Sequence, residues 1–256
     1  MSQPAADPLE PTRDDRRAVR QRAFYRFCRS LVDVFMITVY RPITLHRDRL
    51  PAEGAVLLVA NHQSLYDPPA IGRVVRPRAC SFLARDTLYK GAFGALIVRL
   101  NTIPVNRDAA DAASIRAVIR RLRVGAVLLL FPEGTRSPDG SVRPFKRGSA
   151  LIIKRAGCPV MPVAVEGMQD VWPRSRKLPR LGGRWAVAFG EPIDPAELTA
   201  PGADAAMARL RDEVDALRTE ARAALDKRAD PRRSEEKAKA AKKRNGGTGV
   251  PPVQEE

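Results

Sequence analysis

Aromatic side chains are scarce in this sequence: phenylalanine, tyrosine and tryptophan together make up 5% of its 256 residues. The formal net charge of +16 attracts phosphate groups on nucleic acids, membranes and small molecules alike. A protein that binds single-stranded nucleic acid combines such basic groups with aromatic side chains on which bases stack. The shortage of aromatics, and the lack of a recognition motif, therefore favour phosphate partners other than nucleic acid.

Cysteine and histidine are also rare. Cys28, Cys80 and Cys158 lie far apart, are odd in number and form no CxxC or Cys/His ligand pattern. This argues against a zinc site and favours a reducing compartment. His46 and His62 are the only imidazoles from which a general base can be chosen. His46 lies beside Arg47 in an expected strand, where we expect a surface or packing role.

Long apolar runs are missing as well. The most apolar N-terminal stretch, Ser30–Tyr40, contains Asp33 and falls well short of the ~20 residues that span a bilayer. Apolar residues nevertheless recur there at helical spacing, with arginines between them: Phe24, Phe27, Leu31, Val34 and Phe35, and Arg22, Arg26 and Arg29. This pattern predicts a helical segment over 22–42 that either lies on a membrane surface or packs on the domain.

Both ends of the chain are predicted to be disordered. Residues 1–21 mix acidic and basic side chains without an apolar core, so they also carry no secretory signal that we recognise. The last thirty residues hold nine basic and five acidic side chains, and their part 230–256 has too little apolar surface to repay ordering. We expect a single folded domain over 43–229.

Short apolar runs alternate with helical patterns throughout 43–229, which predicts an α/β domain with a mostly parallel, mixed central sheet flanked by helices. The expected strands are 43–47, 55–60, 79–84, 102–106, 126–131, 159–165 and 184–190. The expected helices are 68–76, 87–99, 111–123 and 148–156, and a final helix over 204–227 whose apolar stripe docks on the core. Residues 168–183 are predicted to form a basic loop.

His62 follows the apolar run 54–60, which places it on the turn at the carboxyl end of a strand, where open α/β sheets bind ligands. Asp67 comes five residues later and precedes Pro68, a favourable helix start. A carboxylate has two oxygens, so Asp67 can cap that helix with one and orient the imidazole of His62 with the other.

Other polar motifs also come directly after apolar strands. Residues 131–137, Phe-Pro-Glu-Gly-Thr-Arg-Ser, follow the run 126–130; we call them the FPEGTRS turn. Arg107 ends the stretch 102–107, and Pro162 lies in the apolar stretch 159–164. If these strands share a parallel sheet, all four motifs meet at one edge.

Together these blocks resemble the glycerophospholipid acyltransferase family. Its order is Asn-His-x4-Asp, a strand ending in Arg, FPEGTRS and a Val-Pro-like strand, which this chain matches over roughly residues 40 to 195, with Phe-Lys-Arg-Gly at 145–148 after FPEGTRS. Two departures stand out: Arg85-Asp86-Thr87-Leu88 replaces a common Lys-Glu-Leu sequence, and Met161 replaces the usual Val.

The resemblance implies an acyltransferase that moves a fatty acyl group to the free hydroxyl of 1-acylglycerol-3-phosphate, from acyl-CoA or an acyl-carrier protein. It needs no cofactor or metal, and it works as a monotopic or peripheral enzyme at the cytoplasmic face of an anionic membrane. By resemblance, His62 and Asp67 form the catalytic pair, and Asn61 and Pro162 are structural motif residues. The block residues implied to bind substrate are Arg107, Glu133, Gly134, Thr135, Arg136 and Lys146.

The chemistry of these side chains agrees with this role. A glycerol hydroxyl needs a positioned base to attack a thioester, and a neutral His62 can take its proton. Arg107, Arg136 and Lys146 can hold a phosphate, whereas we expect Glu133 to orient one of these cations or to accept a hydrogen bond from the glycerol. Backbone N–H groups near Gly134 or after His62 are candidates for an oxyanion hole. Another lysolipid acceptor, a basic nucleic-acid-binding protein and a non-catalytic membrane adaptor remain alternatives.

Overall fold

The described chain folds around one seven-stranded sheet with the order β1-β7-β6-β2-β5-β3-β4. This computed structural model describes residues 7–19, 23–106 and 112–229. The strands are β1 (Ile43–Leu45), β2 (Val56–Ala60), β3 (Cys80–Arg85), β4 (Thr102–Val105), β5 (Val127–Leu130), β6 (Val160–Glu166) and β7 (Ala186–Phe189). β6, β2, β5, β3 and β4 are mutually parallel, while β7 and its parallel neighbour β1 run the opposite way. The predicted mostly parallel, mixed sheet is confirmed.

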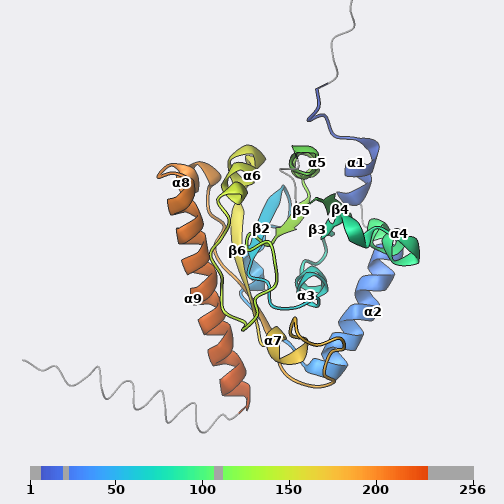
Figure 1. The fold of residues 1–256 in the computed structure, drawn as a ribbon, viewed down its shortest axis with the longest axis vertical. Helices are drawn as coiled ribbons and strands as arrows, with labels where there is room; N and C mark the ends of the chain where they lie inside the picture. The colour runs from blue at the N-terminus through green and yellow to red at the C-terminus, as the bar shows by residue number, and fades with distance from the viewer. Residues whose placement is uncertain (1–6, 20–22, 107–111, 230–256) are drawn as a thin grey trace, which may run out of the picture.

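The parallel strands bring their carboxyl ends to one edge of the sheet. Val59 of β2 pairs with Leu130 of β5, and Ala60 pairs with Val163 of β6, so the segments that follow β2 and β5 leave the sheet side by side. This edge is the lower one in Figure 1, where α7 follows β6. The two sequence blocks around His62 and Glu133 therefore meet there, as predicted.

Helices cover both faces of the sheet (Figure 1). One face packs against α5 (Ala112–Arg123), α6 (Gly148–Ala156), α8 (Pro195–Thr199) and α9 (Ala203–Ala229), and the other against α2 (Ala23–Tyr40), α3 (Asp67–Val74) and α7 (Met168–Val171). Strand residues alternate between the two cores: Leu57 and Val59 face the first, and Val56 and Leu58 the second. Because both faces of the central strands are buried, β2 and β5 read as continuous apolar runs.

The remaining helices refine the predicted boundaries. α4 (Gly91–Arg99) begins later than the expected 87–99, because Asp86–Leu88 forms a separate turn of 3₁₀-helix (η2), and a second 3₁₀ turn (η1) covers Arg47–Arg49. α7 adds one helical turn at the start of the expected loop 168–183. Among the described residues, every helix is too short or too polar to pass through a bilayer.

Helix α2 packs on the domain and still exposes the apolar stripe seen in the sequence. Tyr25, Met36 and Tyr40 are buried against the domain. On the outward side, Phe27 is 67% exposed and Leu31 is 61% exposed. The inner face of the expected helix thus packs on the domain, while the membrane-surface interpretation of its exposed apolar face stays a prediction. Its first residue, Arg22, lies outside the described residues.

The prediction that residues 1–21 are disordered is wrong for the part that the structure describes. Arg13–Val19 forms α1, which packs against α5. Its buried Asp15 accepts hydrogen bonds from Thr12 and, at 3.2 Å, from Arg121 Nε. Burial raises the pKa of Asp15, but these hydrogen bonds outweigh it and lower the pKa below its ordinary value. The expected disordered tail, 230–256, lies outside the described residues.

Candidate active site

His62 and Asp67 form a close, buried pair at the carboxyl end of β2. His62 Nδ1 lies 2.8 Å from Asp67 Oδ2, and the Asp67 side chain is fully buried. The same oxygen accepts the backbone N–H groups of Gln63 at 2.6 Å and Ser64 at 2.7 Å. Asp67 therefore ties the imidazole to the backbone of residues 61–64, which we call the His62 turn. Since Nδ1 is engaged, Nε2 is the ring nitrogen that can take up a proton.

The FPEGTRS turn packs directly against the His62 turn. Glu133 Oε1 accepts the backbone N–H of His62 at 3.0 Å, and Ser137 N donates to the backbone oxygen of His62 at 2.7 Å. The Phe131 ring stacks on the imidazole, with 4.1 Å between ring centroids and 18° between planes. The two sequence blocks therefore build one site: main chain, ring face and Nδ1 of His62 are all held in place.

Glu133 is more deeply buried than we expected for a residue that binds substrate. It is 4% exposed, one carboxylate oxygen contacts the His62 main chain, and Oε2 has no hydrogen-bond partner among the described atoms. Burial raises the pKa of Glu133 to about 7, against the lowering effect of the His62 N–H and the charge of Arg143. In this structure Glu133 holds the main chain of the His62 turn, and the expected hydrogen bond to the glycerol stays a prediction.

Cationic side chains border the FPEGTRS turn. Gly134 has φ +71, and an added Cβ there would lie 2.8 Å from Lys146 Nζ, so the Lys146 side chain crosses this glycine. Arg136 is half-buried in the same turn. Arg174, which the sequence predictions did not single out, donates from Nη1 to Thr135 Oγ1 at 3.3 Å. Its only sequence signal was its place in the basic loop.

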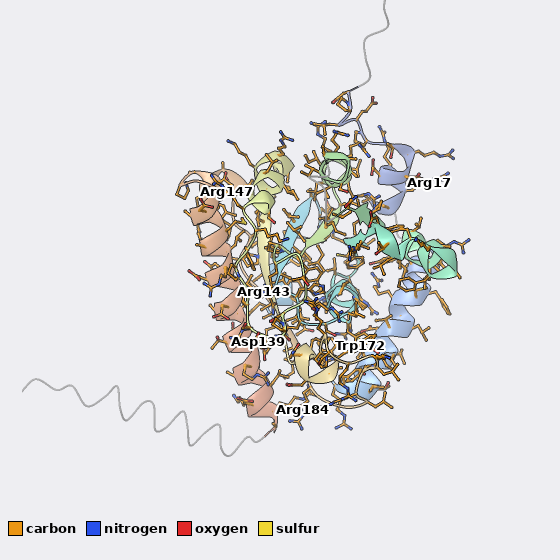
Figure 2. The ribbon with its side chains drawn as sticks, in the orientation of Figure 1. Arg17, Asp139, Arg143, Arg147, Trp172 and Arg184 are labelled. Atoms are coloured by element: carbon orange, nitrogen blue, oxygen red, sulfur yellow. The ribbon has the colours of Figure 1, made fainter. Side chains whose placement is uncertain are left out.

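That loop lies at the same end of the molecule as the His62 turn. Trp172 at its start contacts Tyr66 edge to face, with 4.8 Å between ring centroids. In Figure 2, Arg143, Asp139 and Trp172 lie around the lower end of the sheet, and Arg184 lies further out at the base of the molecule.

Three other residues considered in the sequence do not contact the two turns in the described part of the structure. Arg107 is outside the described residues, although β4 ends at the same edge at Val105. Pro162 is buried inside β6, where it pairs with Val59 and its carbonyl accepts the N–H of Gly190, so it supports the sheet from a position before the edge. His46 contacts Glu220 at 2.7 Å on the surface, in keeping with its expected role.

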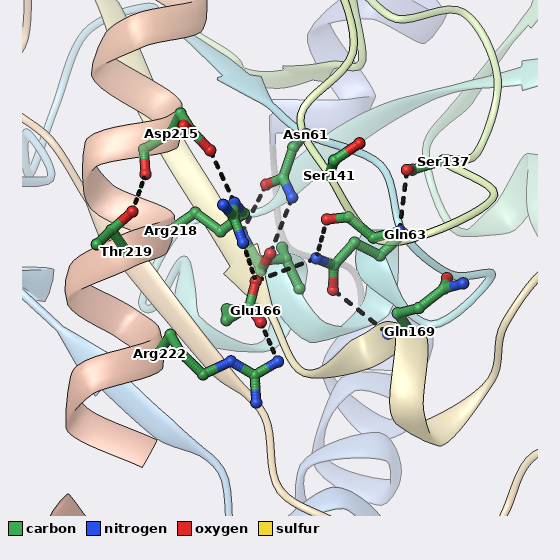
Figure 3. Close-up of polar contacts among 12 residues, drawn as sticks. Asn61, Gln63, Ser137, Ser141, Glu166, Gln169, Asp215, Arg218, Thr219 and Arg222 are labelled. Carbon is green, nitrogen blue, oxygen red and sulfur yellow. Dashed lines mark hydrogen bonds and ion pairs between the residues drawn. The ribbon is translucent and has the colours of Figure 1, made fainter. Parts of the chain in front are cut away.

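Two buried amides on either side of His62 fix the turn to β6. Asn61 Nδ2 donates to Val165 O at 2.9 Å, and Val165 N donates back to Asn61 Oδ1 at 2.8 Å. Gln63 Nε2 donates to Gly140 O at 2.8 Å, and Gln63 Oε1 accepts Met168 N at 3.1 Å. The same oxygen accepts Gln169 N at 3.3 Å (Figure 3). Asn61 was expected as a structural residue, whereas Gln63 was missed; its only signal was its place beside His62.

The expected oxyanion donors are already used. The N–H of Gly134 bonds to Phe131 O at 3.1 Å, and the N–H groups of Gln63 and Ser64 bond to Asp67. These three N–H groups already shape their own turns, and an oxyanion hole built from other N–H groups near Gly134 stays a prediction.

Residues 42–166 match the family model described as Acyltransferase, a little under half of the chain that includes both turns. The crystal structure of the 1-acyl-sn-glycerophosphate acyltransferase of Thermotoga maritima superposes with a TM-score of 0.64 at 27% identity, over 77% of this chain and 80% of that one. Residues 42–166 belong to the acyltransferase family. The resemblance carried by the four sequence blocks is thereby confirmed.

Relatives of this acyltransferase chain include the 1-acyl-sn-glycerol-3-phosphate acyltransferase of Bacillus subtilis, 25% identical over 174 residues, which are 68% of this chain and 84% of that protein. The enzyme of that name from Pseudomonas aeruginosa is 30% identical over 164 residues, 60% of this chain and 62% of that protein. The match covers 53% of the mouse relative, the alpha form. The aligned part thus spans most of the length of the Bacillus subtilis relative and about half of the length of the mouse relative.

Proposed function

We propose that this protein transfers a fatty acyl group from a thioester to the free sn-2 hydroxyl of 1-acylglycerol-3-phosphate, which yields phosphatidic acid and a free thiol. The observation that carries the proposal is the His62–Asp67 pair, 2.8 Å apart, held against a turn bordered by cations. The activities for which the relatives are named support the choice of acceptor.

In the proposed reaction, His62 Nε2 takes the proton of the acceptor hydroxyl while its oxygen attacks the thioester carbonyl. Asp67 stabilises the imidazolium through Nδ1. Collapse of the tetrahedral intermediate breaks the C–S bond, and the imidazolium returns its proton to the thiolate. The ring is then neutral again, so the cycle needs no covalent acyl-enzyme, cofactor or metal.

The acceptor phosphate is proposed to bind among the cations of the FPEGTRS turn. Lys146 lies across Gly134, Arg136 is in the turn, and Arg174 reaches Thr135 from the basic loop. Guanidinium groups suit a phosphate because they donate two parallel hydrogen bonds. Arg107 is also proposed to bind the phosphate, on the basis of its sequence block alone. The acyl donor is proposed to be acyl-CoA or an acyl-carrier protein.

We further propose that the enzyme docks on the anionic, cytoplasmic face of a membrane through the outer face of α2 and the basic loop. The exposed apolar residues of α2 are complemented by Leu178 and Leu181 of the loop, which are 74% and 79% exposed between basic side chains. Tyr40 at the end of α2 donates to Arg180 O at 3.0 Å, which ties the two elements together. Such a surface combines apolar burial with attraction to anionic lipid.

The test is an assay of the purified protein with a panel of lysolipids and both donor types. Turnover is expected with 1-acylglycerol-3-phosphate, and a His62→Ala variant serves as the inactive control. Preference for another lysolipid would change the acceptor while keeping the reaction. Absence of transfer with every acceptor and both donors would refute the proposed function and favour the non-catalytic membrane adaptor.

A further inference from the structure

A second charge cluster, built around a buried carboxylate, lies beside the His62 turn and apart from the residues proposed to contact substrate. Glu166 ends β6 at the same edge of the sheet, and its side chain is 3% exposed. Its carboxylate accepts hydrogen bonds from Arg218 Nη1 at 3.4 Å and from Arg222, both on α9 (Figure 3). A buried carboxylate is strongly disfavoured unless cations accompany it, so the two arginines make this position possible.

Glu166 also contacts the His62 turn. Gln63 Nε2 donates to Glu166 Oε2 at 3.2 Å, next to its bond with Gly140 O. The backbone N–H of Gln63 in turn holds the Asp67 oxygen that pairs with His62. A continuous chain of contacts therefore runs from the α9 arginines through Glu166 and Gln63 to the imidazole.

Each arginine also has a second acidic partner, one on α9 and one on α7. Arg218 Nε donates to Asp215 Oδ1 at 2.8 Å, and Arg222 lies 3.6 Å from Asp170 of α7. Both arginines come after residue 166, where the match to the family model ends. The support of the His62 turn thus extends beyond the segment that carries the sequence blocks.

We propose that Glu166, Arg218 and Arg222 are positioning residues that keep the His62 turn in its reactive geometry through Gln63. A side chain that orients a general base acts on turnover more than on substrate affinity, because the misplaced base fails only in the transition state. The catalytic part of this inference rests on the proposed acyl transfer; its structural part does not.

The first experiment compares Arg218→Met/Arg222→Met with Arg209→Met. Arg209 is a matched control, since it lies on α9 and pairs at 2.8 Å with Glu197 on the surface. We expect the double variant to lose about 10- to 100-fold in kcat with KM changed by less than about threefold, while Arg209→Met behaves as wild type. Arg218→Lys/Arg222→Lys keeps both charges and is expected to recover most of the lost kcat.

Because an unpaired carboxylate at position 166 could unfold the double variant, a triple variant adds Glu166→Gln and removes that charge. It is expected to fold and to keep the low kcat. Combining Gln63→Ala with the double variant should lower kcat by less than the product of the separate effects, since both act through one chain of contacts. Fully multiplicative effects, or wild-type kcat in a folded triple variant, would overturn the inference.

Hydrogen exchange gives a readout that needs no enzyme activity. The N–H groups of His62 and Gln63 are bonded to Glu133 and Asp67, so a peptide covering 61–67 is expected to exchange faster in the triple variant than in Arg209→Met. If wild type shows no acyl transfer but the peptide loosens, the proposed function fails and the positioning cluster stands. If wild type is active and the peptide is unchanged, the positioning role is refuted.

Discussion

Replacing Glu133 by Gln tests how the active site is held together. Glu133 is buried, and its pKa is raised to about 7 from 4.5. An isosteric amide keeps an oxygen that accepts the His62 N–H and removes the charge. The variant should therefore preserve the turn while changing how stability depends on pH.

The direction in which stability changes with pH follows from the number of protons bound by the folded and the unfolded protein. Between pH 4.5 and about 7 the folded wild type holds a proton on Glu133 that the unfolded chain has released. The stabilisation from this raised pKa is complete below pH 4.5 and is lost as pH rises through about 7. A shift of this size corresponds to roughly 3 kcal/mol. Between pH 4 and pH 8, the free energy of unfolding of the Gln variant should rise relative to that of wild type by up to this amount.

Urea unfolding of both proteins at several pH values measures this difference. A difference that stays flat across pH 4.5 to 8 would refute the argument from burial. Activity separates the two roles of Glu133: a purely positioning carboxylate predicts that Glu133→Gln keeps kcat within about tenfold of wild type. Loss of more than about 100-fold, expressed mainly in the acceptor dependence, would support the substrate contact expected from the sequence.

The other predictions concern the base, the phosphate and the membrane. His62→Ala should lower turnover by roughly 10²–10⁴-fold with an unchanged circular dichroism spectrum, and wild-type turnover would remove His62 from the mechanism. Arg174→Ala should lower kcat/KM for the phosphorylated acceptor about tenfold, because one charge-assisted hydrogen bond is lost. Lys177→Ala in the same loop should leave kcat/KM unchanged. Equal effects of the two variants would mean that Arg174 acts only through the overall positive charge of the loop. Phe27→Asp/Leu31→Asp should reduce co-sedimentation with anionic vesicles in low and high salt alike, because it removes apolar contact rather than charge, and unchanged binding would exclude α2 as the anchor.

The sequence alone was enough to predict the sheet and the location of the site. Each of the seven strands was expected within about two residues of its observed bounds. For β2, β5, β6 and β7 the physical reason is that strands buried on both faces are nearly continuous apolar runs. The meeting of His62 with the FPEGTRS turn followed from parallel strands that end at one edge. His62 and Asp67 were identifiable because their contact is local, five residues apart in the chain.

The tertiary structure alone decided what the neighbouring residues do. Glu133 was expected at the substrate and lies instead against the main chain of His62, since the direction of a side chain in a turn depends on how that turn packs. The cluster of Glu166 with Arg218 and Arg222 joins residues more than fifty positions apart, and each has an ordinary solvated interpretation in the sequence. Spacing patterns report which face of an element is buried, whereas the partner of a buried charge is set only when separate elements pack together.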